Sequence, residues 1–236
     1  MKIYSSPICP FVQRVNAVLE AKKVQYEVEY LDLMNLPDWF LKISPNAEVP
    51  VLVTDNNVAL FESFAICEYL EDMYPPKLHP NDPEKRALHR AWARQAVTQY
   101  LVQCSTQRSA SKEILQEKTV NFVELFAKVE KVLGDGPFFD GEQLSMVDTA
   151  WIPILHRSDL IKTYTGYDFL DGYPKVIKWQ QTLLNTDVLK KSVPDMFEEY
   201  FVQFYLNQER YLGRVMNAGP QTITGATKLT LEQDHG

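Results

Sequence analysis

Four prolines fall within the short stretch 75–83, and this cluster divides the chain into two parts of different character. Proline lacks a backbone N–H and its ring clashes with the preceding helical turn, so a helix ends at such a stretch. Before the cluster, short β-like runs alternate with helical patterns, whereas nearly everything after it has helical periodicity. We therefore expect an α/β domain over residues 1–76, a linker, and an all-α domain over residues 84–216.

The first part predicts a β-α-β unit, a short helix, a β-hairpin and a closing helix. Strands are expected where apolar and polar residues alternate, and helices where apolar residues share one face. A turn rich in Asp and Asn at 54–57 joins the two hairpin strands. The predicted strands are 2–4, 25–30, 51–53 and 58–60, and the predicted helices are 11–22, 36–44 and 63–74.

The second part predicts long helices at 84–109, 111–133, 146–162 and 174–190, interrupted by glycine and proline at 134–137. Ser145 and Asp148 have the spacing of a capping box that begins the third of these helices, with Asp in place of the usual Glu or Gln. We assign this pair to folding. The last stretch, 217–236, is polar and is expected to fray.

Charge and hydropathy exclude several classes of function. A net charge of −7 and a sequence pI of about 5.2 argue against a protein that binds nucleic acid or an anionic membrane. The N-terminus lacks the features of a secretory signal, and no run approaches the roughly 18 to 20 apolar residues of a membrane span. We therefore expect a cytoplasmic protein.

Cysteine and histidine usage argues against a disulfide framework and a metal site. The cysteines are too few and too scattered for either, so reduced thiols are expected. The histidines lack the short spacing of metal ligands, so we expect no metal. The residues in question are Cys9, Cys67, Cys104, His79, His89, His156 and His235.

Cys9 is the candidate nucleophile. It follows the first predicted strand, and Pro10 suits the first position of the next helix, which places the sulfur at a helix N-terminus. Unsatisfied N–H groups there stabilise a thiolate, so a lowered pKa is expected. The alternative is a buried, inert cysteine. Because Val12 stands where a Cys-x-x-Cys motif has its second cysteine, a mixed disulfide at Cys9 would need an external thiol to resolve it.

Three motifs in the first 75 residues resemble those of the soluble glutathione transferases. They are SSPICPFVQR from Ser5, PNAEVPVL from Pro45 and FESFAICEYL from Phe61. The Cys-Pro-Phe core and Arg14 are similar to the omega class and its bacterial, lambda and dehydroascorbate-reductase relatives. The resemblance implies a thioredoxin-like domain of order βαβαββα followed by an all-helical domain, glutathione as co-substrate, and a homodimer.

The resemblance also implies where glutathione binds. Val49 precedes a cis proline, Pro50, and its backbone pairs with the cysteinyl part of glutathione. Glu62 and Ser63 bind the γ-glutamyl amine and carboxylate, which suits a carboxylate beside a hydroxyl at a helix N-terminus. Taken singly, Pro50 could simply start a strand, and Glu62 or Ser63 could simply cap a helix.

Other matched positions lie nearby or depart from the family pattern. Phe11 belongs to the Cys-Pro-Phe core and is assigned to the glutathione site. Lys42 is a candidate partner for the glycyl carboxylate. Leu36 stands where omega-class members commonly have a basic residue, and this departure puts the strength of glutathione binding in doubt.

The acceptor pocket is expected from the second domain. Tyr100, Cys104 and Arg108 recur at four-residue spacing and would share one face of a helix beside the thiolate. The same spacing also suits core or domain-interface packing, and this alternative stays open.

The expected function is glutathione-dependent thiol transfer by Cys9, acting on mixed disulfides, S-glutathionyl ketones or dehydroascorbate. One alternative is a conjugating transferase, in which Tyr4, Ser5 or Ser6 stabilises the glutathione thiolate for attack on an electrophile. The other alternative is a non-catalytic binding or regulatory protein that kept the fold, to which Leu36 gives a hint.

Overall fold

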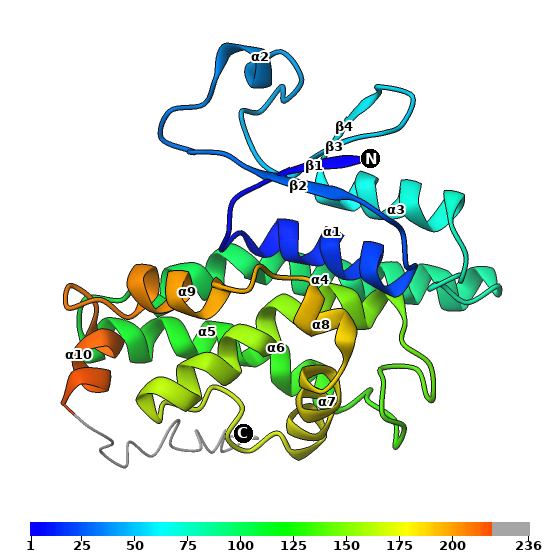
Figure 1. The fold of residues 1–236 in the computed structure, drawn as a ribbon. Coiled ribbons are helices and arrows are strands. Elements are labelled where there is room, and N and C mark those ends of the chain that lie inside the picture. Colours follow the sequence, from blue (N-terminus) through cyan, green and yellow to red (C-terminus); the bar gives the residue numbers. More distant parts are fainter. Residues whose placement is uncertain (219–236) are drawn as a thin grey trace, which may run out of the picture.

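The first domain is built around a small sheet, as the order of elements predicts. The computed structural model describes residues 1–218, and Figure 1 shows the sheet lying between α2 on one side and α1 and α3 on the other. The elements are β1 Lys2–Ser5, α1 Pro10–Ala21, β2 Glu27–Tyr30, α2 Asp38–Leu41, β3 Val51–Val53, β4 Ala59–Phe61 and α3 Ser63–Met73.

The sheet is mixed, with strand order β2-β1-β3-β4. The central strand β1 runs parallel to β2 and antiparallel to β3, so that Ile3 faces Val28 on one side and Leu52 on the other. Ile3 and Leu52 are fully buried against α1 and α3, whose Val15 and Leu70 are also fully buried. The predicted thioredoxin-like order βαβαββα is therefore confirmed.

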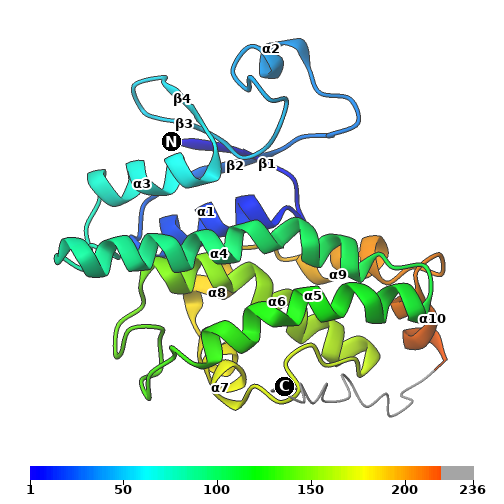
Figure 2. The ribbon, with the colours of Figure 1, turned by 180° about the vertical axis from the view of Figure 1, so that it is seen from behind.

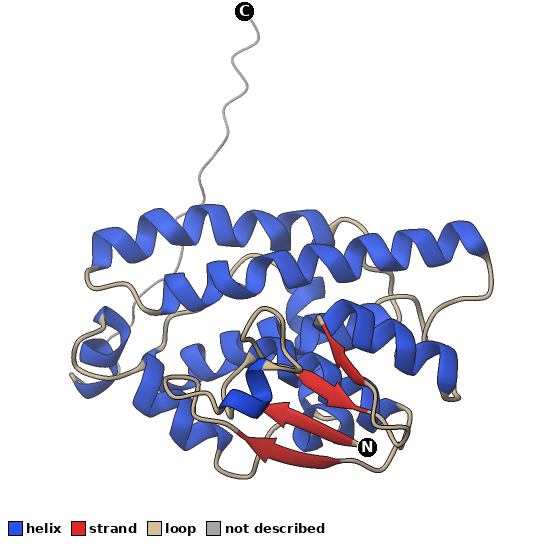
Figure 3. Ribbon diagram, turned by 90° about the horizontal axis from the view of Figure 1, so that it is seen from above, coloured by secondary structure: helices blue, strands red, loops and turns tan. Residues whose placement is uncertain are grey.

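The second domain is entirely helical in the part of the chain that the structure describes. Figure 2 shows α4 and α5 side by side, and Figure 3 colours the helices blue and the strands red. Among residues 1–218 no helix could cross a membrane. The helices are α4 Pro83–Gln107, α5 Lys112–Glu130, α6 Met146–Thr165, α7 Pro174–Leu184, α8 Asp187–Lys191, α9 Phe197–Tyr205 and α10 Tyr211–Asn217.

Several predicted boundaries differ from the structure. The predicted helix 174–190 divides at Asn185 and Thr186, because the Thr186 side chain accepts a hydrogen bond from the Leu189 N–H and begins α8. The predicted helix 36–44 is a single turn that Pro37 precedes. The helices α9 and α10 were missed as separate elements. The prediction for the tail falls almost entirely on residues 219–236, outside the described residues.

Glu71 joins the proline-rich linker to the end of α1. Its carboxylate accepts hydrogen bonds from the backbone N–H groups of Leu78 and His79 at 2.9–3.0 Å and from Lys22 Nζ at 2.6 Å. The same lysine donates to the carbonyl oxygens of Tyr74 and Pro76 at 2.8 Å. Because Lys22 and Glu71 are both almost fully buried, the charges neutralise each other inside the protein.

Asp148 organises the start of α6, the helix at the centre of the second domain. The Ser145 side chain accepts from the Asp148 N–H, and the Asp148 carboxylate accepts from the Ser145 N–H at 2.7 Å, which confirms the predicted capping box. The same carboxylate accepts from the Phe139 N–H at 2.9 Å and from the Trp179 indole N–H at 2.7 Å. Although burial raises the pKa of Asp148, these donors oppose the shift.

We expect replacements at this cap to destabilise the protein in a defined order. Ser145→Ala should lower the free energy of unfolding by about 0.5–2 kcal/mol, because one helix N–H loses its acceptor. Asp148→Ala should cost more, since several buried donors lose their partner at about 1–3 kcal/mol each. Ser111→Ala at the exposed start of α5 is the control and should cost least. Urea unfolding of the variants measures this order, and an equal loss in all three would contradict it.

Candidate active site

Cys9 lies between the end of β1 and the first turn of α1. It is the N-cap residue of α1, and Pro10 occupies the first helical position, as predicted. The sulfur lies 4.0 Å from the carbonyl oxygen of Val49, in the loop before β3. The Val49–Pro50 peptide bond is cis, as the family resemblance implies. The candidate nucleophile therefore faces the loop assigned to glutathione.

The predicted lowering of the Cys9 pKa is wrong for this structure. Burial raises the pKa of the thiol, and this effect exceeds the opposing contribution of the helix start. The N–H groups of Phe11 and Val12 do lower the pKa, as does the positive charge of Arg157. Sequence reasoning identified the helix N-terminus correctly but could not weigh it against the protein atoms that surround the sulfur.

Arg157 of α6 brings a buried positive charge to this site. Its side chain is fully buried and donates hydrogen bonds to the carbonyl oxygens of Ile8 and Pro153, each at 3.0 Å, and to the Gln13 side chain. Within residues 1–218 no carboxylate forms an ion pair with Arg157. Burial lowers its pKa, whereas Cys104, Tyr205 and Cys9 raise it. The cation is therefore held by neutral hydrogen-bond acceptors, and its Nε has no acceptor among residues 1–218.

A polar network continues from Arg157 along the contact between the two domains. Gln13 lies 3.1 Å from His156 Nδ1 and donates to the Ser192 hydroxyl at 3.4 Å. The His156 ring stacks on Phe197 with the centroids 5.0 Å apart. Burial, and then Arg157, lower the pKa of His156 to about 3, so the ring is neutral near pH 7. The network fixes Arg157 without placing a negative charge beside it.

The helix α4 brings two of the three predicted pocket residues to this region. The Tyr100 ring is fully buried and packs edge-on against Phe11 at 5.1 Å, and its hydroxyl donates to the Ala150 carbonyl oxygen at 2.5 Å. Cys104, one turn further along α4, is half-buried and accepts a hydrogen bond from the Tyr205 hydroxyl at 3.1 Å.

Arg108 is not brought to the same place. It lies at the end of α4, exposed, with its guanidinium 5.5 Å from the centroid of the Phe204 ring. Sequence reasoning missed Arg157 and Tyr205. A signal for Arg157 was present, because it stands on the inward face of α6 between Ile154 and Ile161, which are both fully buried.

The residues assigned to glutathione lie on the first domain. Glu62 immediately precedes α3 with a positive φ of 66° and accepts a hydrogen bond from the Asn46 side chain at 3.1 Å. Ser63 is the buried first residue of α3. Lys42 is exposed at the end of α2, and Leu36 packs against the core of the first domain.

The structure also bears on two further expectations from the sequence. Among residues 1–218 no group of three or more His, Cys, Asp or Glu residues could hold a metal ion. The absence of a metal stays a prediction. Arg14, from the first of the three motifs, is fully buried and lies over the Phe64 ring of α3 at 5.5 Å. It therefore belongs to the interior of the first domain.

Comparison with known proteins identifies the family. The family model "Glutathione S-transferase, N-terminal domain" matches residues 8–73, and "Glutathione S-transferase, C-terminal domain" matches residues 112–180. Among solved structures, glutathione transferase Omega 3C from Trametes versicolor superposes with a TM-score of 0.73 at 26% identity, over 82% of this chain and 89% of that one.

Two curated relatives agree with this assignment. "Glutathione S-transferase omega-1" of Rattus norvegicus is 31% identical over 186 residues, which cover 78% of this chain and 76% of the relative. "Probable glutathione S-transferase DHAR1, cytosolic" of Oryza sativa subsp. japonica is 31% identical over 187 residues, or 78% of this chain and 83% of the relative. The chain therefore belongs to the glutathione S-transferase family and is similar to its omega class.

Proposed function

We propose that the protein is a glutathione-dependent thiol transferase in which Cys9 performs the covalent step. The observation that carries this proposal is the position of the Cys9 sulfur. It lies at the start of α1, faces the loop of Val49, and has the N–H groups of Phe11 and Val12 and the cation of Arg157 around it. These groups all favour a thiolate over a thiol.

The reaction is a pair of thiol–disulfide exchanges. The Cys9 thiolate attacks the glutathione sulfur of a mixed disulfide R–S–S–G, forms a Cys9–S–S–G bond and releases R–S⁻, which takes up a proton. A second glutathione thiolate then attacks the glutathione sulfur bound to Cys9. This step forms glutathione disulfide and restores the Cys9 thiolate, so that the reduction of each R–S–S–G consumes one free glutathione, the other half of the glutathione disulfide coming from the mixed disulfide itself.

Arg157 resolves the apparent conflict between burial and reactivity. A buried sulfur resists ionisation because the charged form loses its hydration. A buried guanidinium without a carboxylate partner lacks a counter-charge, so a negative charge beside it would stabilise it. When the Cys9 thiolate forms, its negative charge and the positive charge of Arg157 stabilise each other. In this proposal the resting cysteine is mainly a thiol, and Arg157 lowers the cost of forming the thiolate during the reaction.

Glutathione is proposed to bind along the Val49 backbone, with its γ-glutamyl end at the start of α3. Glu62, Ser63 and the free N–H groups of that helix suit an ammonium and a carboxylate. The Phe11 ring packs against Tyr100 of α4, so a role in binding glutathione is proposed only for its position beside Cys9. Lys42 is exposed and free to reach the glycyl carboxylate, which is proposed as its role. Leu36 has an apolar side chain that packs against the core of the first domain, so this position supplies no charge to the ligand.

The acceptor is proposed to bind on the second-domain side of Cys9, near Cys104 and Tyr205. The omega-1 and DHAR1 relatives support a small acceptor reduced by glutathione, and dehydroascorbate fits the same exchange chemistry. The word "cytosolic" in the name of the rice relative supports the expected cytoplasmic location, and the family supports the expected homodimer.

The conjugating alternative finds less support in the geometry. The Tyr4 ring packs against Trp39 and Phe40 of α2, and the Ser5 hydroxyl donates to the Ser6 carbonyl oxygen. Neither group is turned toward the Cys9 sulfur in these contacts. A binding protein without turnover remains the alternative if Cys9 proves unreactive.

Cys9→Ser tests the proposal directly. Reduction of a small mixed disulfide by glutathione should fall to the uncatalysed rate, because the hydroxyl does not form the covalent intermediate. Conjugation of chloro-dinitrobenzene, run on the same samples, should remain low or rise. Cys67→Ala, which changes a fully buried thiol within α3, is the matched control and should keep the reductase activity. Retained disulfide reduction in Cys9→Ser would remove Cys9 from the mechanism.

The pH dependence of Cys9 alkylation tests the role of Arg157. Because burial raises the pKa of the thiol, the iodoacetamide rate should still rise above about pH 8.5, the usual cysteine pKa. Arg157→Met removes the cation, so the apparent pKa should rise further and alkylation at pH 7.5 should slow. Arg108→Met, which removes an exposed arginine at the end of α4, should leave the profile unchanged. Identical profiles for all three proteins would contradict the role given to Arg157.

A further inference from the structure

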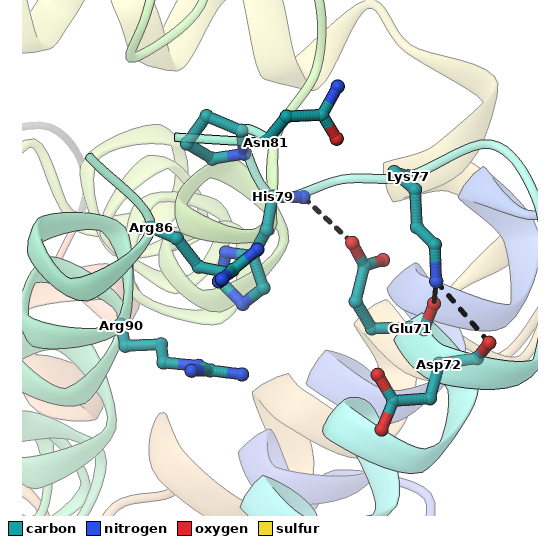
Figure 4. A pocket seen from close by; sticks show the side chains of 8 residues that line it. Glu71, Asp72, Lys77, His79, Asn81, Arg86 and Arg90 are labelled. Carbon is teal, nitrogen blue, oxygen red and sulfur yellow. Dashed lines mark hydrogen bonds between the residues drawn. The ribbon is translucent and has the colours of Figure 1, made fainter. Parts of the chain in front are cut away.

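A pocket of about 360 Å³ lies at the linker between the two domains, away from Cys9. Its residues come from the end of α3, the linker and the first turns of α4, and Figure 4 shows Arg86 and Arg90 extending from α4 opposite Lys77, Glu71 and Asp72. The pocket adjoins the end of α1 where Lys22 lies. Cys9 lies at the other end of this 12-residue helix, about 18 Å along its axis.

The acidic groups of this pocket are mostly occupied. Both oxygens of Glu71 accept hydrogen bonds from the linker backbone, and Lys22 neutralises its charge. Glu68, just behind the pocket, accepts from Arg90 and from His79. Although burial raises the pKa of Glu68, these two donors lower it to about 2, so the carboxylate stays ionised. Neither carboxylate has capacity left for a cationic ligand.

Among the pocket-lining side chains that are not yet paired, positive charges outnumber negative charges. With Glu71 paired to Lys22 and Glu68 paired to Arg90, the charged side chains left in the lining are Lys77, Arg86 and Asp72. Lys77 donates to the backbone carbonyl oxygens of Glu71 and Asp72 at the end of α3. The Arg86 side chain forms no hydrogen bond or ion pair with any of residues 1–218, although its backbone N–H donates to the Asp82 carbonyl oxygen. One positive charge is therefore unmatched, and Arg86 is the donor that is free.

His79 adds a buried nitrogen without a partner. The residue is only 6% exposed, and its Nδ1 forms no hydrogen bond within residues 1–218. Its Nε2 lies 3.1 Å from Glu68 and donates to that carboxylate. A buried polar atom without a partner is costly, so this nitrogen, on a residue that lines the pocket, would gain from a hydrogen bond to a polar ligand atom.

We infer that this pocket, named here the linker pocket, binds a phosphate group carried by a small molecule. Phosphate fits because its oxygens can accept from Arg86, from Asn81 and from the Nη1 group of Arg90, which Glu68 leaves unbonded, while its hydroxyl can donate to His79 Nδ1. The second pKa of a phosphate ester is near 6, so a fraction of the ester carries a hydroxyl donor near pH 7. The pocket volume exceeds that of bare phosphate and leaves room for the rest of a small ester.

Isothermal titration of the full chain at pH 7 with inorganic phosphate, glucose 6-phosphate and glucose tests this inference. Both phosphates should bind saturably at one site per chain, and glucose should not bind. Acetate should bind weakly or not at all, because it lacks an acidic hydroxyl at this pH. Binding should also move the ring nitrogen signals of His79 in NMR spectra, while those of His156 at the domain contact stay in place.

Arg86→Ala provides the decisive variant, with Arg94→Ala as its matched control. Arg94 is an exposed arginine two turns further along α4 and does not line the pocket. Arg86→Ala should weaken phosphate binding by about tenfold or more, as expected for a charge-assisted hydrogen bond of about 1.5–3 kcal/mol. Arg94→Ala should bind as the wild type does. Arg86→Lys should lie between them, because lysine keeps the charge without the planar fork.

The outcome separates this inference from the thiol-transfer proposal. All three arginine variants should keep disulfide reduction, since the linker pocket shares no residue with the site around Cys9. Absence of saturable phosphate binding, or equal binding by Arg86→Ala and Arg94→Ala, would overturn the inference whatever the activity of Cys9.

Discussion

A single buried cation, the guanidinium of Arg157, ties the chemistry of this protein to its architecture. It reaches from α6 of the helical domain to the Ile8 carbonyl oxygen, directly before Cys9. An uncompensated charge in a protein interior is costly, and here neutral oxygens accept hydrogen bonds from the guanidinium. The packing of the two domains and the ionisation of Cys9 are therefore properties of the same contact.

Local features of the fold were predictable because each depends on neighbours in sequence. The proline cluster ends α3, Pro10 begins α1, and Ser145 with Asp148 begins α6; each effect acts within a few residues. The strands were predictable for the same reason, because the alternation of apolar and polar residues is also a pattern between neighbours in sequence. The order βαβαββα followed from these elements together with the motifs that resemble a known family.

Features that depend on distant residues were not predictable in the same way. The pKa of Cys9 depends on how tightly α4, α6 and the loop of Val49 enclose the sulfur. The spacing of residues within 5–14 does not contain that information. Four-residue periodicity correctly grouped Tyr100 with Cys104. It also included Arg108, because periodicity alone does not show where a neighbouring helix such as α9 diverts a long side chain toward Phe204. Likewise, the break between α7 and α8 depends on one Thr186 hydroxyl.

The contact of Glu71 with Lys22 and the linker, at the other end of α1, would be kept in a chimera that joins this first domain and its linker to another helical domain. The partners of Glu71 all lie within residues 22–79, so the contact would travel intact with the first domain into a chimera that carries a different helical half. The cation beside Cys9 would not, because Arg157 belongs to the part replaced. Such a hybrid would keep this joint and still lose the positive charge that opposes the rise in the pKa of Cys9. A chimera that is to keep the cation beside Cys9 therefore needs an arginine at the position of Arg157 on its own α6.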